Sequence, residues 1–475
     1  MSKTTMPRLL RCCGALLALV PALAFAAETP PPKELPPYGE DKPLPLPEVR
    51  ESKLPNGLTV WIVPRSGIPK VSAVLAVRGG GTASDPADRR GIAEVLAEAL
   101  RQGTPKRSAR QIAEELQAVG ASLTSFATDD ALFLTANGLS HGADAVLDVL
   151  ADVAANAAYP DAEVELAKTN ALQALQALQA DPSFYVDKAF ASTLFGKHPY
   201  SFNSPEPATL QGITPDLLRA EHRRRVRPDR ALLVVTGNIE AAAVAQSVER
   251  LFGVWKAAGA APAATGAAPG TVSPSLLVLN RQGSVQSEIR VGRPTLKVTD
   301  PDYFPALVAN TIFGGAFGSR LTRNIREEKG YTYSPSSRLQ AFEQGGMLRV
   351  RAAVRNEVTA ATLLEIIYEL DRMGATLPDD EELARAKQYQ RGLFLLRNET
   401  QGSLAQTLAN NWVNGLAPKA LAEWVPKINA VTAEQVRSVG RRLFGSRQQV
   451  VIVGGDAAAV KEQLAQFGEV REIAP

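Results

Sequence analysis

The sequence predicts an α+β protein made of two similar halves, each a mostly antiparallel sheet packed with helices. The 475 residues are too many for one ordinary domain and suit two domains of roughly 200 residues each. A stretch rich in Ala, Gly and Pro, residues 256–273, divides the chain near its middle. On both sides of it, apolar runs of strand length alternate with amphipathic helical patterns.

The N-terminus has the pattern of a cleavable export signal over residues 1–26. Arg8 and Arg11 precede an apolar run at 14–25, and Ala24-Phe25-Ala26 is a small-residue cleavage site. The run is too short to span a bilayer, and no later stretch reaches the roughly 18 apolar residues that a membrane helix needs. We therefore expect a mature chain without a transmembrane segment, located in the periplasm or else secreted.

Cysteine content and charge exclude several classes of site. Cys12 and Cys13 both lie in the predicted signal, so the mature chain would have neither disulfides nor thiolate metal ligands. The formal charge of +3 is small for this length and gives no sign of a nucleic-acid partner. The basic run Arg223–Arg227 closes a helix before a proline, and we expect it to be a solvated face.

Proline and glycine divide the rest of the chain. Residues 29–47 contain eight prolines, which favours an extended, solvated arm and not a packed element. The predicted organisation is a signal peptide at 1–26, a proline-rich arm at 27–47, an N-terminal domain at 48–255, a linker at 256–273 and a C-terminal domain at 274–475.

The two domains show signs of an internal duplication. Arg230–Gly237 and Arg447–Gly455 are both apolar runs closed by glycine, and each leads into an alanine-rich helix. Two strands are expected within 53–77, around a turn at 65–69. The helices expected in the first half are 91–101, 107–119, 142–156 and 161–179, and those in the second half are 301–313, 319–329, 357–373, 379–397 and 432–444.

The helix at 91–101 has the outline of a zinc-binding helix without its ligands. Its core-facing positions, spaced i, i+3, i+4 and i+7, are Ile92, Val95, Leu96 and Ala99. Glu94, Ala97 and Glu98 fall on another face, where an inverted zinc motif, His-x-x-Glu-His, would place two imidazoles and a glutamate base. Two carboxylates from one helical turn are too few for a hard cation, so we expect a solvated acidic face partly offset by Arg101.

A second constellation lies in the segment 313–334, which reads as a glycine-rich turn, a helix, a glycine stop and a strand. Ser319 is the expected N-cap, and Gly330 is the expected residue after the helix. Arg326 then lies in the last turn, and Tyr333 lies on the strand, on the same face as Tyr331. An Arg and a Tyr on one surface can hold a peptide carbonyl or stabilise negative charge on it.

These motifs resemble those of the pitrilysin/insulinase superfamily of zinc metallopeptidases, which includes the mitochondrial processing peptidase. The resemblance covers essentially the whole mature chain. The segments that carry it are Arg78–Thr82, Gly91–Thr104, Tyr159–Glu165, Lys197–Tyr200, Val235–Asn238 and Phe313–Tyr333. It implies two homologous domains of the metallopeptidase type that together form half of a clamshell.

The resemblance also implies that the metal site is degenerate in this chain. The family's two histidine ligands fall on Glu94 and Glu98, and its catalytic glutamate falls on Ala97. Its third ligand falls on Ala174, and the acid that supports this ligand falls on Ala167. The three histidines of the chain, His141, His198 and His222, are not placed to substitute. We therefore expect no cofactor in this chain.

In the resembled family, an Arg and a Tyr seven residues apart reach from the C-terminal half toward the zinc site of the opposing half or subunit. Arg326 and Tyr333 match these positions, which implies a substrate-binding role in trans. The alternative is that Arg326 pairs with a nearby glutamate while Tyr333 packs on the sheet. The glycines at 314, 315 and 318 serve either close approach of a bound chain or simply a tight turn.

These expectations favour a non-catalytic subunit of a heteromeric periplasmic zinc peptidase. Its partner would carry the intact His-x-x-Glu-His motif and the zinc, and the substrate would be a peptide or an unfolded polypeptide. The alternative is a structural or peptide-binding scaffold with no role in proteolysis. An enzyme with other chemistry is disfavoured because the chain has no Gly-x-Ser-x-Gly elbow, no cysteine nucleophile and no histidine-centred triad.

Overall fold

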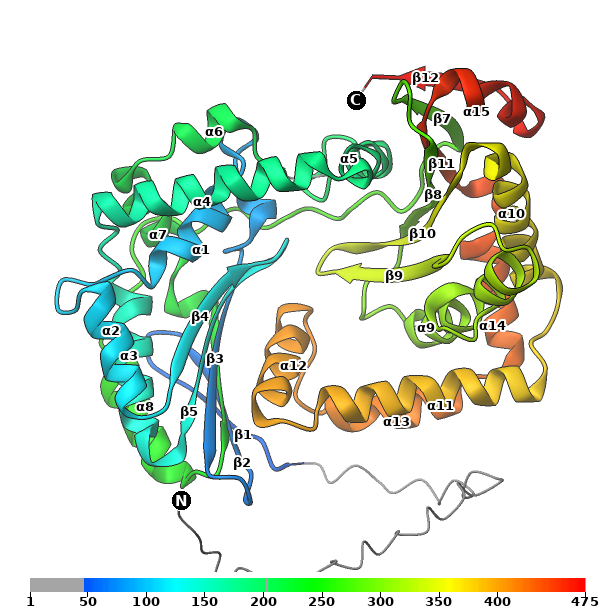
Figure 1. Cartoon of the computed structure of the whole chain (residues 1–475). Coiled ribbons are helices and arrows are strands. Elements are labelled where there is room, and N and C mark those ends of the chain that lie inside the picture. Colours follow the sequence, from blue (N-terminus) through cyan, green and yellow to red (C-terminus); the bar gives the residue numbers. More distant parts are fainter. Residues whose placement is uncertain (1–46, 202–203, 475) are drawn as a thin grey trace, which may run out of the picture. The chain divides into compact units, whose positions relative to one another are not determined.

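The computed structural model describes residues 47–201 and 204–474, which form two six-stranded sheets covered by helices. The expected export signal and nearly all of the proline-rich arm lie outside the described residues. Within the described ranges, no helix combines the length and the apolar character that crossing a membrane requires. The α+β class and the pairing of two similar, mostly antiparallel sheets with helices are as the sequence predicts (Figure 1).

The first sheet has the strand order β1-β2-β6-β3-β5-β4, and only the β2–β6 pair is parallel. Its strands are β1 (Arg50–Lys53), β2 (Thr59–Pro64), β3 (Lys70–Arg78), β4 (Ser122–Ala127), β5 (Ala131–Leu139) and β6 (Ala231–Gly237). The helices of this half are α1 (Ile92–Leu100), α2 (Ala109–Ala118), α3 (Ala143–Asn156), α4 (Asp161–Ala180), α5 (Pro182–Phe195), α6 (Pro207–Gln211), α7 (Pro215–Arg225) and α8 (Ala241–Phe252).

The second sheet has the order β12-β7-β11-β8-β10-β9, with two parallel pairs, β12–β7 and β7–β11. Its strands are β7 (Ser275–Asn280), β8 (Gln286–Thr295), β9 (Ser336–Phe342), β10 (Gly345–Arg355), β11 (Val450–Gly455) and β12 (Val470–Ile473). The helices are α9 (Tyr303–Asn310), α10 (Thr359–Ala375), α11 (Asp380–Arg397), α12 (Gln401–Val413), α13 (Ala420–Ala430), α14 (Ala433–Val439) and α15 (Ala457–Leu464).

The duplication is visible in the strand order. The run β2-β6-β3-β5-β4 of the first sheet matches β7-β11-β8-β10-β9 of the second, including the parallel central pair and the hairpin at one edge. In both sheets the strand in the second place of this run, β6 or β11, is the apolar run closed by glycine. These strands are almost wholly buried because both faces of the sheet are covered at this point.

One helix of each half packs on the sheet of the other half. The helix α12 lies on β3 and β6, and α5 lies on β8 and β11 (Figure 1). Arg290 of β8 forms an ion pair with Asp187 of α5 at 2.7 Å, and the Arg78 guanidinium stacks on the Trp412 ring of α12 at 3.9 Å. The two halves are therefore joined by reciprocal packing as well as by the linker, which contains no helix or strand.

The sequence prediction of a strand through Tyr331 and Tyr333 is wrong. Residues 331–335 are irregular, and β9 begins only at Ser336. Pro335 has no backbone N–H to give to a ladder, so pairing starts directly after it. The helix before this segment also differs from expectation, because Thr322–Glu328 has π-helical hydrogen bonding, as in the 3.0 Å bond from Lys329 N–H to the Asn324 carbonyl.

Candidate functional site: a degenerate metal site and an arginine–tyrosine pair

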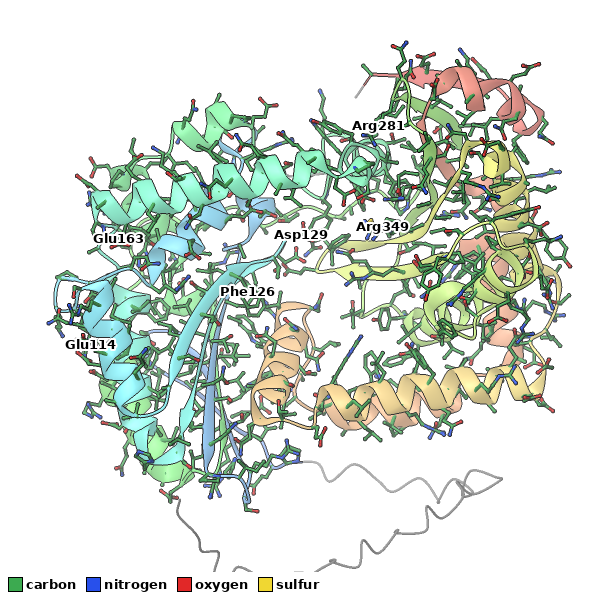
Figure 2. All side chains as sticks on the ribbon, viewed as in Figure 1. Glu114, Phe126, Asp129, Glu163, Arg281 and Arg349 are labelled. Carbon is green, nitrogen blue, oxygen red and sulfur yellow. The ribbon has the colours of Figure 1, made fainter. Side chains whose placement is uncertain are left out.

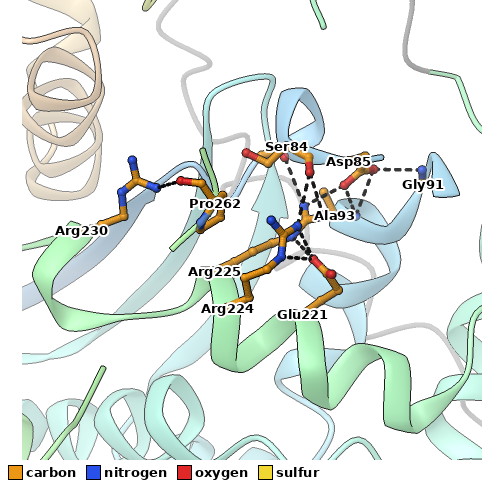
Figure 3. Close-up of polar contacts among 10 residues, drawn as sticks. Ser84, Asp85, Gly91, Ala93, Glu221, Arg224, Arg225, Arg230 and Pro262 are labelled. Atoms are coloured by element: carbon orange, nitrogen blue, oxygen red, sulfur yellow. Dashed lines mark hydrogen bonds and ion pairs between the residues drawn. The ribbon is translucent and has the colours of Figure 1, made fainter. Parts of the chain in front are cut away.

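A buried ion-pair network holds the start of α1, the helix that carries the former metal positions (Figure 3). The carboxylate of Asp85 accepts hydrogen bonds from the backbone N–H groups of Gly91, at 3.0 Å, and Ala93, at 3.2 Å. Arg225, at the end of α7, donates to Asp85 at 2.7 Å and to Glu221 at 2.6 Å. A carboxylate at a helix N-terminus satisfies N–H groups that the helix itself cannot.

The sequence suggested that the basic run at 223–227 is a solvated face, but only Arg223 of the run is exposed. Arg225 is 0% exposed, and Arg227 is also buried. The remaining donors of Arg225 bind the carbonyls of Gly81 and Ser84, while Arg227 donates to Asp229 and to the linker carbonyl of Gly259. Burial is possible because each guanidinium finds an acid and carbonyl acceptors in its surroundings.

The positions that the resemblance assigns to the metal site line a cavity with a volume of about 600 Å³, except for Ala97. Glu94, Glu98, Ala167 and Ala174, from α1 and α4, line this cavity. The turn after β4 contributes Asp129, and β10 contributes Arg349, both labelled in Figure 2. The cavity therefore combines residues of both halves.

Ala97 does not join this group. It is 2% exposed within the first-half core, and its carbonyl accepts a hydrogen bond of 2.5 Å from the Ser125 hydroxyl. Ala97 is therefore not among the residues that line this cavity. A methyl side chain packs against the neighbouring sheet where a glutamate base would need a path to the cavity.

The residues present do not fit a zinc ion. Both carboxylate oxygens of Glu98 accept hydrogen bonds from Arg101, at 2.7 and 2.9 Å, and Ala167 and Ala174 have no donor atom. Glu94 is the one remaining candidate ligand among these positions. Desolvation raises the pKa of its carboxyl group, and the charges of Asp85 and Asp129 raise it further. Among the residues that the structure describes, no three His, Cys, Asp or Glu side chains converge to hold a metal ion.

None of the three histidines lines this cavity. His222 is buried against Tyr159, with 2.9 Å between Nδ1 and the phenol oxygen, and burial lowers its pKa to about 4. His198 lies 3.1 Å from the Gly266 carbonyl of the linker, and His141 is exposed in a short turn after β5.

Asp129 gives the cavity a measurable pH dependence. Burial, with a smaller contribution from the charge of Asp130, raises the pKa of Asp129 from 3.8 to about 6, and a hydrogen bond from Thr82 partly opposes this shift. The folded chain therefore binds more protons than the unfolded chain between these two pKa values. The free energy of unfolding falls as pH rises through this window, and the full cost is present above it.

Replacing Asp129 with asparagine is expected to raise the free energy of unfolding at pH 7.5 by on the order of 1–2 kcal/mol, and to change it little at pH 4. Urea denaturation at the two pH values measures this difference. The exposed Asp88 is the matched control, because Asp88→Asn is expected to change stability by less than about 0.5 kcal/mol at either pH. An equal gain at both pH values for Asp129→Asn would contradict the assignment.

Arg326 and Tyr333 are brought together at a second site. The helix begins at Ser319, whose hydroxyl accepts from the Thr322 N–H at 3.4 Å, and ends at Gly330, whose φ of 66° is left-handed. The chain then turns so that the Arg326 guanidinium lies 4.3 Å from the Tyr333 ring centre and 4.6 Å from that of Phe317. The cation is thus held between two aromatic rings.

In this pair Tyr333 is exposed and Arg326 is partly buried, and Arg326 has no acidic partner among the described residues. Phe317 is 68% exposed and Tyr333 is 79% exposed, so neither ring packs on the sheet. Within the described residues, Arg326 makes no ion pair. The alternative in which a glutamate neutralises Arg326 and the sheet covers Tyr333 is therefore not the observed arrangement. The stacked faces of the guanidinium leave its N–H edge available to an acceptor.

The Arg326–Tyr333 pair opens into a cavity of about 570 Å³, which also contains Glu288, Arg351 and Tyr389. Gly314 and Gly315 also line this cavity, and at both positions the neighbouring residues leave no room for a side chain. A Cβ at Gly315 would lie 2.6 Å from Asn310 Nδ2, and one at Gly314 would lie 2.6 Å from Leu321. These two glycines serve the tight turn, whereas a Cβ at Gly318 would meet open space.

Two family models match this chain. The model described as insulinase (peptidase family M16) matches residues 62–206, and the model described as peptidase M16 inactive domain matches residues 212–389. Together they cover more than half of the chain. The matched ranges contain both sites: the former metal positions lie in the first range, and Arg326 and Tyr333 lie in the second.

Similar proteins and structures agree with this match. A protein of Mycobacterium tuberculosis called an uncharacterized zinc protease is 28% identical over 425 residues, covering 87% of this chain and 95% of that protein. The uncharacterized zinc protease YmxG of Bacillus subtilis is 28% identical over 371 residues, covering 77% of this chain and 88% of that protein.

Among solved structures, a peptidase M16 inactive domain from Pseudomonas fluorescens is similar in fold, with a TM-score of 0.79 at 21% identity over 86% of this chain and 98% of that one. A protease from Helicobacter pylori has a TM-score of 0.79 at 16% identity, over 86% of this chain and all of that one. The motifs, the duplicated fold and these matches agree, and the chain belongs to the pitrilysin/insulinase superfamily of metallopeptidases, peptidase family M16.

Proposed function

We propose that this chain is the non-catalytic subunit of a heteromeric periplasmic zinc peptidase, in which it binds substrate for a partner that carries the zinc. The observation that carries the proposal is the contrast between the two sites. Every ligand position that the resemblance assigns is occupied by an unsuitable residue, while the partly exposed Arg326 lies close to the exposed Tyr333.

The first site explains why the chain would not hydrolyse peptides by itself. Glu98 is neutralised by Arg101, Ala97 is buried in the core, and Ala174 offers no ligand atom. No general base stands at the position where the family places one. A cavity of about 600 Å³ remains, large enough to admit a segment of peptide without chemistry of its own.

The second site explains what the chain would contribute. Phe317 and Tyr333 cover the two faces of the Arg326 guanidinium, so its free N–H edge is held in one orientation. The N–H edge and the Tyr333 hydroxyl are two donors for the carbonyl of a scissile peptide bond. The partner's zinc would activate the attacking water, and this chain would fix and polarise the carbonyl.

The proposal is tested by purifying the tagged chain from its native cell envelope and identifying the proteins that accompany it by mass. The expected result is a companion in equal amount that contains His-x-x-Glu-His and zinc. The Arg326→Ala variant is the control and is expected to capture the same companion, because the exchange removes a donor and no core contact. Recovery of the chain alone, or with unrelated envelope proteins, would favour the scaffold function instead.

A further inference from the structure

The face of the second sheet that meets α5 holds four neighbouring arginines. In the register of β10 with its neighbours, Arg349 lies directly opposite Arg338 of β9, and Arg351 lies directly opposite Arg290 of β8. Arg349 and Arg351 are two residues apart on β10, so both point to the same side of the sheet. Val350, between them, belongs to the second-half core on the other side. The four side chains therefore lie on one face, which we call the arginine face.

This arrangement of charges is unfavourable within the chain itself. Directly opposite residues of an antiparallel pair have Cβ atoms about 5 Å apart, and like charges at that separation repel each other. Asp187 of α5 offsets part of the charge through ion pairs with Arg290, at 2.7 Å, and with Arg349, at 3.3 Å. Glu288 also pairs with Arg290, at 2.9 Å. Burial lowers the pKa of the Arg349 guanidinium, and the charges of the three other arginines lower it further, although Asp187 opposes them.

The exposed end of the arginine face keeps its positive charge. Arg338 and Arg351 are exposed, and neither forms an ion pair with any residue that the structure describes. Asp181, at the start of α5, lies within range of the Arg351 charge, but its carboxylate caps the helix by accepting a hydrogen bond from the Ser183 N–H at 2.8 Å. Ser336, directly opposite Arg351 on β9, adds a hydroxyl and no charge. Two guanidinium groups are thus available to a bound anion.

The arginine face connects the two cavities described above. Arg349, labelled in Figure 2, lines the cavity at the former metal positions, and Arg351 lines the cavity of the Arg326–Tyr333 pair. The two residues are about 6.7 Å apart along β10, so the direct path between the cavities leads over this face. Alternate side chains of an extended peptide have the same spacing and point to one side. Carboxylates at alternate positions of such a peptide therefore match the arginines in register.

We propose that the arginine face binds acidic segments of the polypeptide that this chain holds for its partner, with carboxylates at alternate positions turned toward the sheet. Arg338 and Arg351 bind these carboxylates, because the planar guanidinium group pairs with a carboxylate through two N–H groups. The inference rests on the proposed function and adds the class of peptide to it, namely an extended segment rich in glutamate or aspartate.

Fluorescence anisotropy of labelled peptides, measured on the purified chain without its partner, tests this inference. The probe is a peptide in which glutamate alternates with alanine over about 30 Å of extended chain. It is expected to bind about tenfold more tightly at about 0.1 M salt than the same peptide with glutamine in place of glutamate, and this preference is expected to shrink as salt is raised. A peptide with the same glutamates in one block turns half of them away from the face and is expected to bind about threefold less tightly than the probe.

Substitutions locate the binding on the arginine face. Arg338→Gln and Arg351→Gln are each expected to weaken binding of the glutamate peptide about fivefold and to leave the glutamine peptide unaffected. Both side chains are exposed and repelled by their neighbours, so the melting temperature is expected to be kept or slightly raised. Arg355→Gln is the matched control, because Arg355 is exposed on the same side of β10 but lies about 13 Å beyond Arg351 and lines neither cavity. It removes the same charge and is expected to change binding by less than about twofold.

Equal binding of the glutamate and glutamine peptides would overturn the inference. Equal effects of Arg351→Gln and Arg355→Gln would do so too, because net charge alone would then explain the binding. Stronger competition by a single-stranded oligonucleotide than by unlabelled glutamate peptide would assign the face to another class of polyanion. These results leave the proposed function standing, since capture of the zinc-bearing companion does not depend on them. Failure to capture that companion, with the preference for glutamate retained, would overturn the proposed function alone.

Discussion

Replacing Arg225 with alanine is expected to lower the free energy of unfolding by about 3–5 kcal/mol. The exchange would leave Asp85, whose side chain is 1% exposed, without its ion-pair partner, and Glu221, whose side chain is 10% exposed, with Arg224 alone. Burial raises the pKa of Asp85 and the charge of Arg225 opposes this, so removal of the guanidinium is expected to favour the protonated acid. Urea denaturation at pH 7 measures the loss.

The neighbouring Arg223 supplies a matched control, because it is exposed and belongs to the same basic run. Arg223→Ala is expected to change the free energy of unfolding by less than about 0.5 kcal/mol. A loss for Arg225→Ala no greater than that of the control would show that the network does not hold the start of α1. Hydrogen exchange at the N–H groups of Gly91 and Ala93 adds a local readout, since both depend on Asp85.

The same network shows that a local sequence pattern does not contain the long-range partners of a buried charge. The run at 223–227 looks solvated because nothing local shows that Arg225 and Arg227 are buried. The acid that completes the burial of Arg225 is Asp85, 140 residues earlier in the sequence. Local patterns report periodicity and breaks, so they predicted the helices and the duplicated strands well. They carry no information about which distant residues meet in the core.

The exchange of helices between the halves was missed for a related reason. The helix α12 was not predicted, and its polar residues Thr400, Gln401 and Ser403 at the start read as a loop. Its buried side chains include Leu404, Leu408 and Ala409. They are buried because α12 packs on β3 and β6 of the other half, and this packing cannot be read from the segment itself. Tertiary packing here decides the structure of a segment whose own pattern is weak.

The sequence predicted which residues belong to the candidate sites, but it did not predict which other residues surround them. The motif placed Arg326 and Tyr333 seven residues apart, and the structure brings their side chains into contact. Phe317, the second ring on the guanidinium, was not predicted, although an aromatic residue between two glycines of an exposed turn is a usable signal. Ala97 was expected on the face of Glu94, and the helix pattern does not reveal that Ala97 is buried in the first-half core.

Replacing Arg326 with alanine is expected to lower the turnover of the two-chain peptidase by about 10²–10³-fold, the range found when one donor to a developing oxyanion is removed. The side chain carries the only fixed positive charge that the structure places between Phe317 and Tyr333. The measurement is steady-state hydrolysis of a peptide by the purified complex of this chain with its zinc-bearing partner.

Arg323 is the matched control, since it is exposed on the same helix three residues earlier and neither ring contacts it. Arg323→Ala is expected to leave turnover within about twofold, which is a surface-substitution effect of less than 0.5 kcal/mol. Tyr333→Phe separates the roles of that residue, because it removes the hydroxyl donor and keeps the ring that orients Arg326. Equal turnover of the native complex and Arg326→Ala would leave the chain as a scaffold for its partner.

The separate effects of Arg326→Ala on kcat and on KM then show at which stage of the reaction Arg326 acts. If its N–H edge holds the carbonyl only as negative charge develops, kcat and kcat/KM fall together and KM stays constant. If it binds the substrate equally well before and during the reaction, KM rises and kcat is unchanged. The aromatic rings on both faces favour the first result, because a cation held in one orientation is already placed for the charge that appears on the carbonyl oxygen.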